Sequence, residues 1–138
     1  MNIKICIKFI VFLLTVKFAF AEVVDLNNEE IIKLSNTNIP IVDVRRSSEW
    51  VQTGVIPNSI LLTFFDEEGN YNFDEWYEKL QLEINVTDPI ILICRSGYRS
   101  KIVANMMDKE FNTTIYNAQS GMNSWISEKL ITVEPQTN

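Results

Sequence analysis

The amino-acid sequence predicts an α/β fold in which a five-stranded parallel sheet is flanked by helices on both faces. Five short runs of β-branched and other apolar residues alternate along the chain with segments whose apolar residues recur at helical spacing. The most apolar run, Ile90–Cys94, is an unbroken stretch of isoleucine and leucine that ends in a cysteine, which is typical of a strand covered on both faces. Strands that alternate with helices favour parallel pairing through right-handed crossovers.

The expected elements run from residue 22 to residue 130. Strands are predicted at residues 22–26, 39–44, 59–64, 90–94 and 113–118. Helices are predicted at residues 27–35, 47–54, 73–84, 100–111 and 122–130. The first helix begins with Asn27 and Glu30 at the spacing of a capping box. In the third helix, Trp76 and Leu80 lie on one flank, as expected of an amphipathic helix.

Residues 1–21 have the composition of a secretory signal peptide. Two lysines come first, an apolar stretch follows, and two alanines flank a phenylalanine at the end (Lys4, Lys8, 9–16, Ala19 and Ala21). The alternative is an uncleaved membrane anchor, which Lys17 disfavours because a span needs about 20 apolar residues. We therefore expect cleavage after Ala21, one mature domain at residues 22–138, and a periplasmic or secreted protein that is not attached to the membrane.

The composition excludes several classes of function. The chain has 12 basic residues, 18 acidic residues and no histidine, for a net charge of −6. Three lysines and none of the acidic residues lie in residues 1–21, so cleavage leaves nine cations against 18 carboxylates, a net charge of −9. Nucleic acid is not an expected partner at this charge. Without histidine, Ser-His-Asp and Cys-His mechanisms and histidine-based zinc sites are excluded, and we predict no cofactor and no metal.

One cysteine remains in the expected mature chain. Cys6 lies in the predicted signal peptide, whereas Cys94 ends the predicted fourth strand. The mature protein cannot form an internal disulfide, and an unpaired cysteine in an oxidising compartment indicates a reactive thiol or one paired between molecules. The alternative is an inert cysteine that only fills space in the core. Ligands of parallel α/β sheets bind beyond the carboxyl ends of the strands, which is where Cys94 is expected.

The loop after this strand is suited to an anionic sulfur. Its residues are Cys94, Arg95, Ser96, Gly97, Tyr98, Arg99 and Ser100. Backbone N–H groups of the loop and the start of the next helix are expected to surround the sulfur and to favour the thiolate. Gly97 permits a positive φ angle, and Ser100 suits the N-cap of the helix. The two arginines are expected to attract an anionic substrate, although each alone would be read as a solvated surface residue.

The segment Cys94–Ser100 resembles the active-site loop of the rhodanese sulfurtransferases. Residues Ile41–Ile60 are similar to the upstream signature of that family, and Gln119–Trp125 is similar to its glycine-containing turn before the last helix. The resemblance implies a rhodanese-like fold and a thiosulfate sulfurtransferase. Cys94 would take a sulfane sulfur from a donor such as thiosulfate, and the N–H groups from Arg95 through Arg99 would stabilise the resulting persulfide. The acceptor would be cyanide, a small thiol or a cysteine of another protein.

The upstream segment also contains three charged residues that we predict to form a structural set of ion pairs and hydrogen bonds. They are Asp43, Arg45 and Glu49, and only Arg45 is expected to approach the substrate. At three positions the chain departs from the family, which usually has one histidine and two glycines where this sequence has Val55, Asn58 and Ser120. These departures concern the geometry of turns and leave the loop itself intact.

Two other functions remain open. A non-catalytic rhodanese-like module would bind a partner or relay sulfur within a complex. A phosphatase or arsenate reductase of the same broader fold would need a wider loop of the form Cys-x5-Arg. In this chain the position of that arginine is occupied by Ser100, so the loop favours sulfur over phosphate.

Overall fold

The computed structural model describes residues 22–110 and 113–136 of the chain. The predicted signal peptide lies outside the described residues, so cleavage after Ala21 and export stay predictions. Within the described ranges, no helix has the length and apolar character that crossing a membrane would require.

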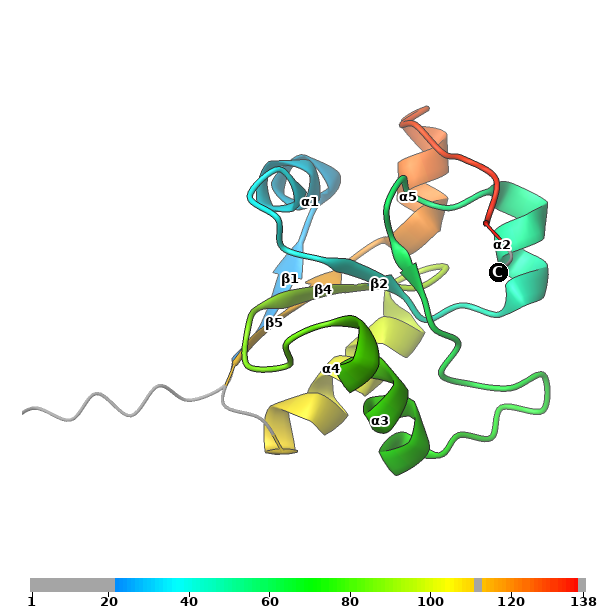
Figure 1. Cartoon of the computed structure of the whole chain (residues 1–138). Helices are drawn as coiled ribbons and strands as arrows, with labels where there is room; N and C mark the ends of the chain where they lie inside the picture. Colours follow the sequence, from blue (N-terminus) through cyan, green and yellow to red (C-terminus); the bar gives the residue numbers. More distant parts are fainter. Residues whose placement is uncertain (1–21, 111–112, 137–138) are drawn as a thin grey trace, which may run out of the picture.

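Five parallel strands form one sheet in the order β1-β5-β4-β2-β3. They are β1 (Glu22–Leu26), β2 (Ile41–Asp43), β3 (Ile60–Leu61), β4 (Ile90–Ile93) and β5 (Thr114–Ala118). The predicted strands are confirmed, and the most apolar of them, β4, occupies the centre of the sheet (Figure 1). The edge strand β3 is shorter than predicted, because only Ile60 and Leu61 pair in the regular ladder with β2.

Helices cover both faces of the sheet, as predicted (Figure 1). The five helices of the described residues are α1 (Asn28–Ser35), α2 (Ser47–Thr53), α3 (Phe73–Glu83), α4 (Tyr98–Glu110) and α5 (Gly121–Ser127). Helices α3 and α4 lie against one face, and α1 and α5 lie against the other (Figure 1). The short helix α2 follows β2 at the carboxyl end of the sheet.

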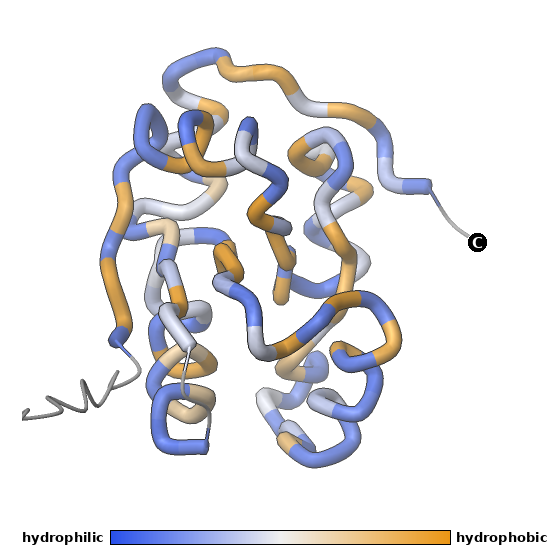
Figure 2. The backbone as a smooth tube through the Cα atoms, turned by 60° about the vertical axis from the view of Figure 1, so that its left-hand side comes forward, coloured by the Kyte–Doolittle hydropathy of each residue, from blue (hydrophilic) through white to orange (hydrophobic). Residues whose placement is uncertain are grey.

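Alternating side chains of β4 enter two separate cores. Ile90 and Leu92 pack toward α3 and α4, whereas Ile91 and Ile93 pack toward α1 and α5, and all four are buried. The helices contribute Trp76, Leu80 and Met107 to the first core and Ile31, Met122 and Trp125 to the second. Figure 2 shows the hydrophobic stretches that run through the middle of the molecule. Cys94 belongs to the core beneath α3 and α4.

The two predicted helix starts have different outcomes. The capping box of α1 is confirmed, because the Asn27 side chain accepts from the N–H of Glu30 at 3.0 Å and Glu30 accepts from the N–H of Asn27 at 2.9 Å. The prediction that Ser100 caps the fourth helix is wrong, because α4 begins at Tyr98. The N–H of Lys101 donates to the carbonyl of Gly97 at 3.2 Å, so the helical turn already includes Ser100.

The three departures from the family pattern leave the turns intact. Asn58 has a φ of 63°, and asparagine tolerates this left-handed conformation better than most residues. Ser120 has a φ of −110°, which any residue can adopt. Val55 exchanges two backbone hydrogen bonds of 2.9 Å with Val133. The residues that replace histidine and glycine are therefore compatible with the local backbone.

Candidate functional site

Cys94 directly follows the central strand β4, at the carboxyl end of the sheet where the sequence predicted it. The residue is 0% exposed and forms no disulfide. Arg95, Ser96 and Tyr98 of the same loop are exposed. The sulfur therefore lies beneath the loop, and a donor can reach it only if side chains or backbone around the loop move aside.

Two groups of the loop contact the sulfur. The N–H of Gly97 lies 3.2 Å from Sγ of Cys94, and the hydroxyl oxygen of Ser100 lies 3.3 Å from it. Helix α4 begins at Tyr98, so its positive end lies next to these contacts. An N–H donor and a helix start are groups that stabilise nearby negative charge in proteins. Among the predicted N–H donors from Arg95 through Arg99, the structure brings that of Gly97 within hydrogen-bond range of the sulfur.

The start of α5 holds the backbone of the loop in this orientation. The N–H of Met122 donates to the carbonyl of Cys94, and the N–H of Asn123 donates to the carbonyl of Arg95, each at 2.9 Å. Because these bonds engage the carbonyl oxygens, the negative ends of the two peptide groups are directed to α5 instead of the sulfur. The late turn that the sequence singled out thus supports the loop rather than lining a ligand site.

Two glycines allow the loop and the late turn to approach this closely. Gly97 has a φ of +88°, and a Cβ atom there would overlap the carbonyl oxygen of Gln119. Gly121 has a φ of +55°, and a Cβ atom there would overlap the carbonyl oxygen of Cys94. Both the backbone conformation and the lack of space therefore require glycine. The positive φ predicted for Gly97 is confirmed.

The two arginines of the loop have different surroundings. Arg99 makes two hydrogen bonds with the Glu49 carboxylate, at 2.8 and 2.7 Å, and the bond to Glu49 raises the pKa of Arg99. Partial burial would raise the pKa of Glu49, but hydrogen bonds from Arg99 and from the N–H of Arg46 outweigh it and hold that pKa below its usual value. Arg95 is exposed, and within the described residues no carboxylate lies at ion-pair distance from it.

A pocket of about 360 Å³ opens beside the loop. Its lining consists of Arg46, Ser48, Glu49, Arg95, Ser96, Tyr98 and Arg99. Three of these side chains are cations and one is an anion. The pocket is thus a local positive site on a chain whose net charge is −6, as an anionic ligand would require.

Comparison with known proteins agrees with the geometry of the loop and sheet. The family model of the rhodanese-like domain matches residues 27–128, which include β2, β4, the whole Cys94–Ser100 loop and the turn before α5. The chain belongs to the rhodanese-like domain family. An uncharacterized protein of Buchnera aphidicola subsp. Schizaphis graminum is 34% identical over 127 residues, which are 89% of this chain and 78% of the relative.

Two further matches of this rhodanese-like domain carry names from sulfur chemistry. The putative sulfur carrier protein YrkF of Bacillus subtilis is 30% identical over 91 residues, which are 66% of this chain but 43% of that protein. The solution structure of a 30 kDa polysulfide-sulfur transferase homodimer from Wolinella succinogenes has a TM-score of 0.63 and 22% identity, with 87% of this chain and 85% of that chain covered. The family supports a sulfur-related role for this domain, and the Wolinella succinogenes structure shows that its fold is shared.

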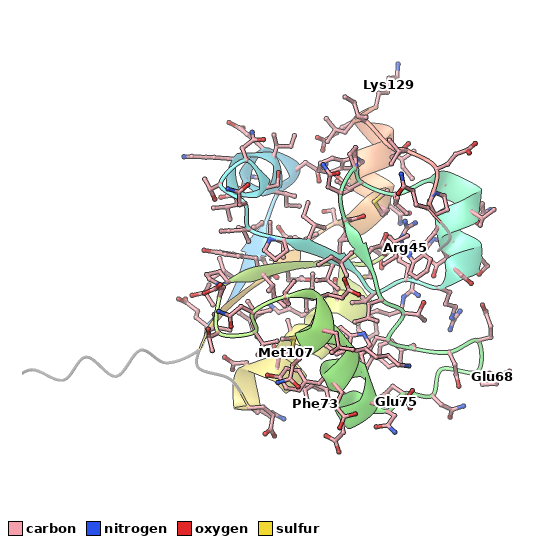
Figure 3. All side chains as sticks on the ribbon, in the orientation of Figure 1. Arg45, Glu68, Phe73, Glu75, Met107 and Lys129 are labelled. Carbon is pink, nitrogen blue, oxygen red and sulfur yellow. The ribbon has the colours of Figure 1, made fainter. Side chains whose placement is uncertain are left out.

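The three upstream charged residues of the rhodanese-like domain form the predicted structural set around Arg45, which pairs with the Asp43 carboxylate and donates to the backbone carbonyl of Glu49 at 3.5 Å. The carboxylate of Glu49 pairs instead with Arg99. Arg45 is 1% exposed and bonds to the Asp43 carboxylate at 2.7 to 3.0 Å, to the Thr53 hydroxyl at 2.8 Å and to the carbonyl of Gly54 at 2.9 Å. Figure 3 shows Arg45 inside the molecule, in contrast to Glu68 and Lys129 at its periphery. The expectation that Arg45 approaches the substrate is wrong, because its guanidinium ties β2 to the end of α2.

Sequence reasoning missed two residues behind the sulfur. Asn117 of β5 is 2% exposed, and its Oδ1 accepts a hydrogen bond of 2.6 Å from Ser100. Its Nδ2 donates to Asp25 of the neighbouring strand β1 at 2.8 Å. Asn117 lies two residues from the buried Ile115, so an asparagine at an inward-facing position of an apolar strand was the signal available in the sequence. Within the described ranges, no three acidic, cysteine or histidine side chains are grouped as metal ligands.

Proposed function

We propose that this rhodanese-like domain is a sulfurtransferase that carries a sulfane sulfur as a persulfide on Cys94. The thiolate attacks the outer sulfur of a donor such as thiosulfate, the S–S bond of the donor breaks, and sulfite leaves with the bonding electrons. A nucleophilic acceptor then attacks the outer sulfur of the persulfide, and Cys94 leaves as the thiolate. Cyanide would become thiocyanate, and a thiol would become a persulfide. The observation that carries the proposal is the contact of the sulfur with the N–H of Gly97 and the hydroxyl of Ser100.

The surroundings of the loop support an anionic donor. Arg95 is exposed without a carboxylate partner among the described residues, whereas Arg99 is paired with Glu49. Arg95 is therefore the cation best placed to attract a dianion into the pocket, and Arg99 mainly fixes the shape of the loop. Tyr98 is 72% exposed at the tip of the loop, where it is positioned to meet the acceptor.

The dimensions of the loop support sulfur over phosphate. Ser100 is fully buried and places its hydroxyl against the sulfur, at the position where a phosphatase loop would have its arginine. A phosphate would then lack its main charged ligand. Measurable hydrolysis of p-nitrophenyl phosphate that requires Cys94 would contradict this assignment.

Intact-mass spectrometry tests the proposal directly. The full chain is incubated with thiosulfate, and we expect a gain of one sulfur atom that cyanide removes with the formation of thiocyanate. Cys94→Ser should show no gain, while Cys6→Ser should behave as the unchanged protein because Cys6 lies outside the predicted mature domain. Absence of the adduct with thiosulfate and with a polysulfide donor would refute sulfur transfer by this chain.

One observation favours a second candidate, a module that binds a partner or relays sulfur only within a complex. Cys94 is 0% exposed, so a partner could be needed to open the loop. This candidate predicts no turnover on thiosulfate and cyanide, together with partner binding that survives Cys94→Ser. Steady-state turnover of the isolated protein that depends on Cys94 would exclude it.

We also propose that residues 1–21 direct export and that the domain acts in a periplasm or outside the cell. The motif supports this, with its early lysines, apolar stretch and terminal alanines. N-terminal sequencing of the protein from a cell fraction should begin at Glu22. Recovery of the full chain from the cytoplasm would contradict both export and cleavage.

A further inference from the structure

A chain of hydrogen bonds connects the sulfur of Cys94 to the surface of the domain. The hydroxyl oxygen of Ser100 lies 3.3 Å from Sγ of Cys94 and 2.6 Å from Oδ1 of Asn117. Nδ2 of Asn117 lies 2.8 Å from Oδ1 of Asp25, which also accepts from Nζ of Lys101 at 2.9 Å. Ser100 and Asn117 are buried, whereas Asp25 lies at the surface. The buried part of this hydrogen-bond network is therefore shielded from water. Its protons must be shared among the residues of the network.

Asp25 determines which way the amide of Asn117 faces. Hydrogen bonds from Asn117 and Lys101 lower the pKa of Asp25, so its carboxylate is ionised at neutral pH. A carboxylate can only accept hydrogen bonds, so the NH₂ group of Asn117 must face it. The carbonyl oxygen of Asn117 then faces Ser100, and this atom can also only accept.

Ser100 has a single hydroxyl proton to distribute. A distance of 2.6 Å between the oxygens of Ser100 and Asn117 requires a proton between them, and only Ser100 can supply it. The carbonyl of Gly97, at 3.3 Å, is a longer and weaker alternative acceptor. When the Ser100 hydroxyl donates its proton to Oδ1 of Asn117, a lone pair of the hydroxyl oxygen faces Sγ of Cys94. The hydroxyl can then accept a hydrogen bond from a Cys94 thiol, but it cannot donate one to a thiolate.

We infer that Asn117, oriented by Asp25, is a positioning residue that competes with Cys94 for the proton of Ser100 and thereby sets how readily the thiolate forms. The inference deepens the proposed function, because the thiolate is the attacking species there. In the thiol state the hydroxyl donates to Asn117. When the thiolate forms, the hydroxyl rotates and donates to the sulfur, and the carbonyl of Asn117 loses that partner. Removing the carbonyl of Asn117 should therefore make the thiolate easier to form.

The ionisation of Cys94 can be followed without a reagent that must enter the buried site. A thiolate absorbs ultraviolet light, at wavelengths just below the aromatic near-ultraviolet bands, more strongly than a thiol does, so absorbance against pH gives a midpoint. The full chain is used with Cys6→Ser, so that Cys94 is the one thiol, and the same chain with Cys94→Ser is subtracted to remove the contribution of the tyrosines. This readout does not depend on any sulfur donor.

The expected shifts have opposite signs. Asn117→Leu keeps a similar volume but has no acceptor, and it should lower the midpoint by about one pH unit, since a hydrogen bond to a charged group has an effect of that size. Ser100→Ala removes the hydroxyl that donates to the thiolate, so it should raise the midpoint. Asn105→Leu, on the exposed side of α4, is the matched control and should leave the midpoint unchanged.

A double variant separates the competition from a general structural effect. Asn117→Leu should have no effect on the midpoint when Ser100→Ala is also present, because the shared proton is then absent. An unchanged or raised midpoint in Asn117→Leu, or a lowering that persists with Ser100→Ala, would overturn the inference. If Asn117→Leu fails to fold, Asp25→Ala replaces it. Asp25 is at the surface, and its loss frees the Asn117 amide to turn and lowers the midpoint in a Ser100-dependent way.

Failure of this inference is distinguishable from failure of the proposed function. Midpoints that shift as expected in a protein that never gains sulfur would refute the sulfurtransferase and leave the competition intact. A sulfur adduct on Cys94, together with midpoints that do not depend on Asn117, would support the sulfurtransferase and refute the competition for the Ser100 proton.

Discussion

The segments that follow β2 and β4 lie side by side, yet they use arginine for opposite purposes. The two strands are neighbours, and the N–H of Val44 donates to the carbonyl of Ile93 at 3.0 Å. Shortly after β2, Arg45 is buried with the Asp43 carboxylate. Shortly after β4, Arg95 is exposed and has no carboxylate at ion-pair distance in the described part of the chain. Proximity to the site therefore does not by itself make an arginine available to a ligand.

The difference follows from the cost of burying charge. A guanidinium that loses its water must regain hydrogen bonds from the protein, and Arg45 does so with Asp43, Thr53 and Gly54. A guanidinium that stays in water can exchange its solvent for an anion at little cost. Arg45 is thus committed to the fold, whereas Arg95 stays exposed, as the proposed attraction of an anionic donor requires.

The largest expected effect tests the buried side of this comparison. Arg45→Met should lower the free energy of unfolding by about 3–5 kcal/mol, because it leaves the Asp43 carboxylate buried without its partner. Arg46→Met is the matched control, since Arg46 is partly exposed and pairs with Glu67 at 3.7 Å across the surface, and it should cost less than about 1 kcal/mol. Urea unfolding measures both. Equal losses of unfolding free energy in Arg45→Met and Arg46→Met would show that burial does not determine how much each arginine contributes to stability.

The next effect tests how the β4 loop is supported. Gly97→Ala should lower the free energy of unfolding by about 2–4 kcal/mol and abolish the sulfur adduct, because the added Cβ meets the carbonyl of Gln119. Gly69→Ala also has a positive φ but meets no atom within 4 Å, so it should show the backbone cost alone, about 1–2 kcal/mol, and keep the adduct. Retention of the adduct in Gly97→Ala would argue against the support from the late turn.

A smaller effect tests the exposed side of the comparison. Arg95→Met should raise the KM for thiosulfate about tenfold with little change in kcat or in stability, because it removes an exposed cation, without a carboxylate partner among the described residues, from the pocket. Arg95→Lys should recover most of the affinity, since it restores the charge. Steady-state kinetics at several salt concentrations provide the measurement. A KM that is unaffected by Arg95→Met would assign the attraction of the donor to other residues.

The smallest effect concerns pH and the pair of Glu49 and Arg99. The pKa of Glu49 is lowered in the folded state, so its contribution to stability is present above the usual carboxyl value and is lost as pH falls through the lowered one. The pair is partly exposed, so this contribution should stay below about 1 kcal/mol. Glu49→Gln should remove part of the acid loss of stability between neutral pH and pH of about 3. If the unfolding free energies of the wild-type protein and Glu49→Gln fall in parallel as pH is lowered, the pair does not contribute to the acid dependence of stability.

Local patterns were enough to predict the framework of the domain. The apolar run of β4, the capping box at Asn27 and the glycine of the loop were read correctly because each depends on neighbours within a few residues. The start of α4 was misplaced, because serine is a common N-cap and nothing in the sequence shows that Ser100 turns inward to Cys94 and Asn117. The role of Arg45 was misjudged for a similar reason, since its partners Thr53 and Gly54 meet it only after α2 folds back.

The sequence by itself determined the alternation of strands and helices and the identity of the loop around Cys94, because periodicity, turn residues and short motifs act through neighbours along the chain. Only the tertiary structure decided which charges are paired, how deeply the sulfur lies and which strand supplies the acceptor behind Ser100. Glu49 and Arg99 are 50 residues apart, and Asp25 and Asn117 are 92 residues apart. Such contacts arise when parallel strands align their ends at one edge of the sheet, and the free energy of each charge depends on what that alignment places beside it.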